Sequence, residues 1–116
     1  MLRLVFQYRH IVDIDQAREL LIACVDTFTS AINADIRIHP YLANYPFKPK
    51  NIDIMIVLRN PDGSRGPPGT FILIHAAEGK FQYNIDDPET TRMKTIYEET
   101  YEEAVLKIGE KQKTYK

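Results

Sequence analysis

Several features that would place a chain in an easily recognised class are scarce in this sequence. Only one cysteine, Cys24, occurs among 116 residues, which excludes a framework of internal disulfides. The longest apolar runs, 54–58 and 71–74, are far shorter than the roughly 20 residues that a membrane-spanning helix needs. Fifteen basic residues against sixteen acidic ones give a net charge of -1, which excludes nucleic-acid binding through overall positive charge.

Motifs for catalysis, metal binding and phosphate binding are also missing. Neither Ser30 nor Ser64 stands in a Gly-x-Ser-x-Gly turn, and Cys24 falls on an apolar helical stripe, where it is expected to act as a small buried hydrophobe. The glycine-rich stretch 63–70 lacks the lysine of a phosphate-binding loop and leads into a strand, so we expect a hairpin loop there. The histidines are too widely spaced for a metal motif: His10, His39 and His75. We therefore expect a non-catalytic protein without a metal or cofactor.

The composition, 44% hydrophobic and 27% charged, is typical of a globular chain. Its length suits one domain, so residues 1–116 are predicted to form a single unit. The start lacks the basic segment and long apolar stretch of a signal peptide, which favours the cytoplasm by default. The alternative is a domain excised from a longer exported or membrane-anchored protein, with its signal removed and a start methionine added.

The strongest local signal predicts a helix over residues 14–32. Asp13 is a good N-cap with Gln16 three residues later, and apolar residues follow at helical spacing. Asn33 is the expected C-cap. Three charged residues are assigned to the solvent side of this helix: Arg18, Glu19 and Asp26.

Alternating or β-branched segments predict the strands, which are expected near 2–8, 36–38, 52–58, 71–77, 81–85 and 91–98. Glu78-Gly79 is a tight-turn signal. The segment 91–98 could also belong to a long helix opened by Asp87-Pro88, but the capping box of Thr100 and Glu103 favours a strand followed by a helix over 101–112.

These elements predict an α+β fold of order β-α-β-β-β-β-β-α. We expect a mainly antiparallel sheet of about five or six strands, with the two helices packed on one face. The strands 52–58 and 71–77 are apolar on nearly both faces, so they are expected to be central and covered on both sides. The acidic group around the second helix start is assigned to a solvated turn that matches the helix dipole: Glu98, Glu99, Glu102 and Glu103.

The segment 36–50 is the favoured interaction site. It combines basic and aromatic residues with prolines and has no acidic residue, and prolines reduce the entropy that a loop loses on binding. The expected contact residues are Arg37, His39, Tyr41, Tyr45, Phe47 and Lys48, with Lys50 beside them. The alternative is that the rings of this segment plug the end of the core.

The first functional hypothesis is a small interaction module that binds a protein partner or a second copy of itself, through this segment or an exposed sheet edge. The second is a small-molecule binder or enzyme with a pocket between helix and sheet, where His75 is a polar anchor together with Arg37 and His39. The third, ranked last, is single-stranded nucleic-acid binding on the sheet, with Phe81 and Tyr83 as stacking groups.

Overall fold

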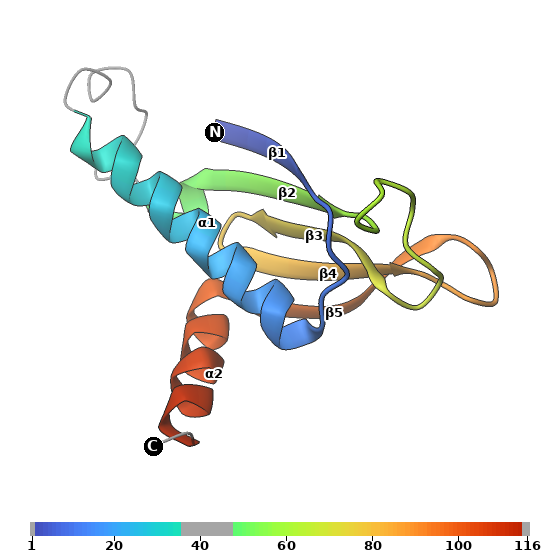
Figure 1. The fold of residues 1–116 in the computed structure, drawn as a ribbon. Coiled ribbons are helices and arrows are strands. Elements are labelled where there is room, and N and C mark those ends of the chain that lie inside the picture. Colours follow the sequence, from blue (N-terminus) through green and yellow to red (C-terminus); the bar gives the residue numbers. More distant parts are fainter. Residues whose placement is uncertain (1, 36–47, 115–116) are drawn as a thin grey trace.

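The computed structural model describes residues 2–35 and 48–114, which form a five-stranded sheet and two α-helices (Figure 1). The helices are α1 (Ile14–Ala34) and α2 (Tyr101–Thr114), and a 3-10 turn, η2, covers Pro49–Asn51. The strands are β1 (Leu2–Tyr8), β2 (Ile52–Leu58), β3 (Phe71–Ala77), β4 (Lys80–Asp86) and β5 (Met93–Thr100).

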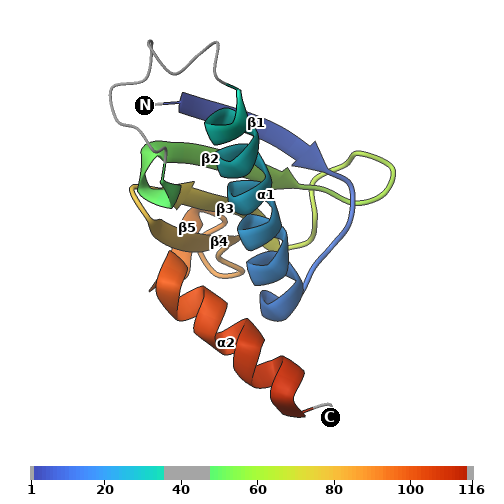
Figure 2. The same ribbon diagram turned by 90° about the vertical axis from the view of Figure 1, so that its left-hand side faces the viewer.

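The strands lie side by side in the order β1-β2-β3-β4-β5, where β1 and β2 are parallel and all other pairs are antiparallel. α1 crosses one face of the sheet, and α2 packs beside α1 and extends beyond the β5 edge (Figures 1 and 2). The predicted α+β class and the mainly antiparallel sheet are confirmed. The short strand expected at 36–38 lies outside the described residues.

One face of the sheet carries the core. Side chains of alternate residues on β2, β3 and β4 meet the apolar stripe of α1, and Leu21 and Val25 of that stripe are fully buried. The sheet residues at the centre of this layer are Ile52, Ile54, Ile56, Leu58, Ile74, Ala76, Phe81 and Tyr83. The expectation that β2 and β3 are covered on both sides is wrong, because Met55, Val57 and His75 on the opposite face are only half-buried.

The two capping boxes act as the sequence predicts. The Asp13 carboxylate accepts a hydrogen bond from the Gln16 backbone N–H at 2.7 Å, and the Gln16 side chain accepts one from the Asp13 N–H at 3.0 Å. α1 continues to Ala34, so Asp35 is the C-cap and the expected cap at Asn33 is wrong.

The start of α2 is fixed by the second box. Thr100 accepts from the Glu103 N–H at 3.1 Å, and Glu103 accepts from the Thr100 N–H at 3.0 Å. The segment before it is strand β5, paired with β4, so the prediction of a strand rather than a long helix there is confirmed. In the β3–β4 turn Glu78 and Gly79 both have positive φ, 52° and 78°, which is the conformation of a type I′ hairpin.

A buried ionic cluster ties both helices to the sheet, and it overturns two assignments. The Glu99 side chain is completely buried and accepts hydrogen bonds from Arg18 Nε at 2.8 Å, Tyr83 Oη at 2.5 Å and Lys107 Nζ at 2.9 Å. Arg18 is buried as well, with 6% of its surface exposed. The predictions that Arg18 faces solvent and that Glu99 belongs to a solvated turn are therefore wrong, because the two side chains pair with each other and are buried together.

Burial alone would raise the pKa of Glu99. The hydrogen bonds from Arg18, Tyr83 and Lys107 and the positive charge of Arg18 outweigh that effect and hold the pKa of this carboxyl below its usual range. Burial raises the pKa of the Tyr83 hydroxyl, which therefore stays protonated and donates a hydrogen bond to Glu99. The cluster is thus charged and fully paired at neutral pH.

Replacing Glu99 should destabilise the fold strongly. We expect Glu99→Ala to lower the free energy of unfolding by about 3 kcal/mol, since it leaves the buried Arg18 without its partner. The neighbouring Glu98→Ala is the matched control and should change it by less than about 0.5 kcal/mol, because Glu98 is exposed. Urea unfolding followed by circular dichroism measures both. Equal effects of the two substitutions would contradict the cluster's role.

Candidate functional site

The outer edge of β1 is one of the two unpaired backbone edges of the described sheet, and the outer edge of β5 is the other. Within residues 2–35 and 48–114, β1 pairs with β2 alone, and the register is continuous from Leu2–Ile52 to Tyr8–Leu58. The Tyr8 carbonyl accepts a hydrogen bond from the Arg59 N–H at 3.0 Å, so the backbone groups of Tyr8 point toward β2.

Backbone direction alternates along a strand, so every second residue of β1 points its N–H and C=O away from β2. These outward residues are Arg3, Val5 and Gln7. Their backbone groups form a row at the sheet edge that another extended chain could join by hydrogen bonding.

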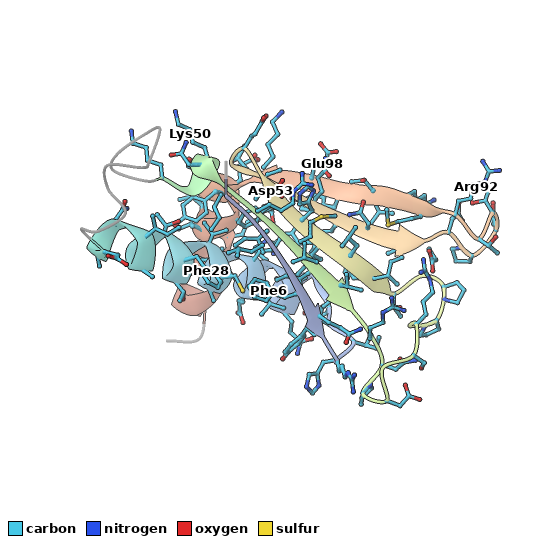
Figure 3. The ribbon with its side chains drawn as sticks, turned by 90° about the horizontal axis from the view of Figure 1, so that it is seen from above. Phe6, Phe28, Lys50, Asp53, Arg92 and Glu98 are labelled. Atoms are coloured by element: carbon cyan, nitrogen blue, oxygen red, sulfur yellow. The ribbon has the colours of Figure 1, made fainter. Side chains whose placement is uncertain are left out.

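Apolar side chains flank this edge on both faces of the sheet. Val5 is 62% exposed on the face away from α1, whereas Phe6 and Tyr8, at 37% and 39%, lie on the α1 side. Phe6 also stacks on Phe28 of α1 with ring centroids 5.5 Å apart, and the two rings point toward one another in Figure 3. β1 is therefore held against α1 by the contact of Phe6 with Phe28, and its outer edge stays accessible to solvent.

The opposite edge of the sheet is built differently. In β5, Tyr97 pairs with Tyr83 and Thr95 with Asn84, so Ile96 has no residue opposite it and forms a β-bulge. Two exposed charged residues, Lys94 and Glu98, also lie on this strand. Bulges and charges are the usual means by which a sheet edge avoids pairing with other chains, and β1 has no bulge and a single charged residue, Arg3.

A hollow of about 430 Å³ lies at the end of β1, where the chain turns toward α1. Tyr8, Ile11 and Leu20 supply apolar surface to it, and His10 and Glu19 supply polar groups. It continues the exposed apolar surface of β1 beyond the end of the strand.

The face of the sheet away from α1 carries a polar group at its centre. His75 Nε2 lies 2.5 Å from Asp53 Oδ1, and Arg3 donates to Asp53 Oδ2 at 3.1 Å. Asp53 is seen on this face in Figure 3, together with Glu98. His75 therefore does not lie between helix and sheet, and the expected pocket position for it is wrong.

Burial of Asp53 would raise its pKa, but hydrogen bonds and charge from His75 and Arg3 outweigh this and lower the pKa of Asp53. The side chain of Asp53 is 4% exposed, whereas that of Arg3 is 66% exposed. The three residues form a satisfied ionic group that joins β1, β2 and β3.

The structure places the other predicted site residues in three different ways. Five of them lie outside the described residues: Arg37, His39, Tyr41, Tyr45 and Phe47. Lys48 is exposed, and its backbone N–H bonds the Asn51 side chain at 2.9 Å. Phe81 and Tyr83 are buried beneath the helices, so their expected role as stacking groups for nucleic acid is wrong.

Cys24 packs against the core and is half-buried, and burial raises the pKa of its thiol. Among residues 2–35 and 48–114, no three histidine, cysteine, aspartate or glutamate side chains are placed to share a metal ion. No helix in the described part of the chain is long and apolar enough to cross a membrane. Comparison with protein-family models, curated proteins and solved structures found no match to this chain.

The β1 edge makes a direct prediction for amide hydrogen exchange. In dilute solution the amides of Leu4, Phe6 and Tyr8 should be protected by their bonds to β2, whereas those of Arg3, Val5 and Gln7 should exchange nearly as fast as in an unfolded chain. NMR-detected exchange measures each amide separately. Uniform protection along the strand at low protein concentration would contradict the open edge.

The ionic group on the opposite face predicts a shift that NMR titration can measure. The carboxyl of Asp53 should titrate below its ordinary value of 3.8, and His75→Ala should raise its midpoint because a hydrogen bond and a charge are lost. The contribution of the ionised Asp53 carboxylate to stability is present above pH 3.8. It disappears as the pH falls through the lowered pKa of Asp53. Gln82→Ala is the control, since Gln82 bonds Glu98 instead. An unchanged Asp53 midpoint in His75→Ala would contradict the coupling.

Proposed function

We propose that this chain is a non-catalytic interaction module that binds an extended protein segment along the outer edge of β1. The observation that carries the proposal is the row of outward backbone groups on Arg3, Val5 and Gln7, in a regular strand that is hydrogen-bonded on one side. Addition of a strand to such an edge is a recurring mode of peptide recognition.

The energy of such binding has two sources. Each backbone hydrogen bond contributes on the order of 1 kcal/mol net, because it replaces bonds to water. Burial of apolar surface adds roughly 25 cal/mol per Å², and Val5, Phe6 and Tyr8 offer that surface on the two sides of the edge. Both terms are available without rearrangement, since the strand is already held by β2 and by the contact of Phe6 with Phe28.

The side chains beside the edge define the partner. An added strand would place alternate residues on the two faces, next to Phe6 on the α1 side and next to Val5 on the other. Both neighbours are apolar, so the segment should be apolar at the positions that face them. The basic segment around Arg37 and Lys48 remains a second predicted contact.

A pull-down with mass spectrometry from lysate of the source organism tests the proposal with a matched pair of variants. Val5→Pro removes one outward N–H and leaves the bonds to β2, whereas Val5→Thr keeps the N–H and a β-branched side chain. A second copy of the chain counts as a partner. The partner should bind the wild type and Val5→Thr and be lost or strongly reduced with Val5→Pro.

Circular dichroism and thermal unfolding must first show that both variants are folded. Equal capture by all three proteins would move the binding site away from β1. Absence of a specific partner for any of them would remove the support for an interaction module.

A further inference from the structure

We infer that the segment bound along β1 is β1 of a second copy of this chain, running antiparallel. This inference rests on the proposed function, because it names the partner of the same edge. It follows from the order of residues on β1, which is complementary to itself when reversed about Val5.

The register follows from the outward backbone groups. If Val5 faces the partner's Val5, then Arg3 faces the partner's Gln7, and Gln7 faces the partner's Arg3. Every outward residue then forms a hydrogen-bonded antiparallel pair, in which each residue both donates and accepts. A shift in either direction leaves at least one outward residue of each strand without a partner in the other strand.

Side chains agree with this register. Leu4 lies beside the partner's Phe6 on the α1 side, and the two copies of Val5 meet on the other face. The charged Arg3 lies opposite the neutral glutamine, so no like charges meet across the pair. Pairing centred on Arg3 would instead place two positive charges directly opposite each other, which is destabilising.

The helices leave room for the second copy. α1 lies mainly over β2, β3 and β4, and α2 lies at the β5 end of the sheet (Figures 1 and 2). A twofold axis perpendicular to the sheet at Val5 would continue the sheet from one copy into the next, with both α1 helices on the same side. Such a pair is closed, because each copy has only one β1 edge.

Cysteine cross-linking tests the register directly, in a Cys24→Ala background that removes the native thiol. Facing residues of a hydrogen-bonded antiparallel pair have Cα atoms about 5.5 Å apart, which a disulfide can span. Val5→Cys alone should therefore form a covalent dimer on mild oxidation. Arg3→Cys and Gln7→Cys should each stay largely monomeric alone and form a dimer when mixed.

Analytical ultracentrifugation supplies the second readout. Wild type and Val5→Thr should show a concentration-dependent monomer–dimer equilibrium, and Val5→Pro should weaken it by about tenfold or more because both bonds at the central pair are lost. In the wild type, the Val5 amide should become protected from exchange as concentration rises. If Val5→Pro does not fold, the cross-linking pattern still tests whether two copies pair through β1 in this register.

The failures of the two proposals can be told apart. A wild type that stays monomeric up to millimolar concentration, or cross-linking at positions 3 or 7 alone as strong as at position 5, overturns the self-pairing. If the pull-down then still shows a partner that Val5→Pro loses, the strand-binding function stands with a different protein as its ligand. If the pull-down finds no partner either, the self-pairing and the strand-binding function are both overturned.

Discussion

The buried carboxylate of Glu99 is the constraint on which the arrangement of this fold depends. It stands at the end of β5, where α2 begins, and takes a hydrogen bond from each of three other elements: Arg18 on α1, Tyr83 on β4 and Lys107 on α2. A carboxylate without these partners would carry a large desolvation penalty. The sheet and the two helices must therefore meet at this point in one orientation, which apolar packing alone specifies less strictly.

This anchor lies on β5, at the edge of the sheet opposite β1. The Tyr101 hydroxyl adds a second link between the helices, donating to Asp26 at 2.6 Å, and Ala104 of α2 is completely buried. α2 is thus held at the β5 end of the sheet, whereas α1 lies mainly over β2, β3 and β4. β1 is left at the far edge, where Phe6 makes the ring contact with Phe28 and the outer backbone stays open. The strand order places β1 at this edge, and the helices leave its outer backbone uncovered.

Local signals in the sequence were enough to predict most of the elements. The capping boxes at Asp13 and Thr100 and the turn at Glu78-Gly79 depend on residues within three positions of each other, so their geometry follows from the sequence. Arg18 and Glu99 are 81 residues apart, and nothing local shows that two charged side chains will bury each other. The prediction that both faces of β2 are covered is wrong for a similar reason. Met55 and Val57 are apolar, but only the assembled fold shows that no described helix covers them.

The β1 edge could have been suspected from its alternation and its single charge, but not assigned, because strand order decides which strand is at the edge. The structure also offers a comparison within one sheet. β5 exposes apolar Met93 and Ile96 but also carries a bulge and exposed charges, whereas β1 exposes Val5, 62% accessible, on a regular strand without a bulge. A lysine at position 5 would leave the buried core intact and would protect the edge from other chains. Folding alone does not require valine there, and an apolar residue at the centre of an open edge suits a surface that is covered by another strand.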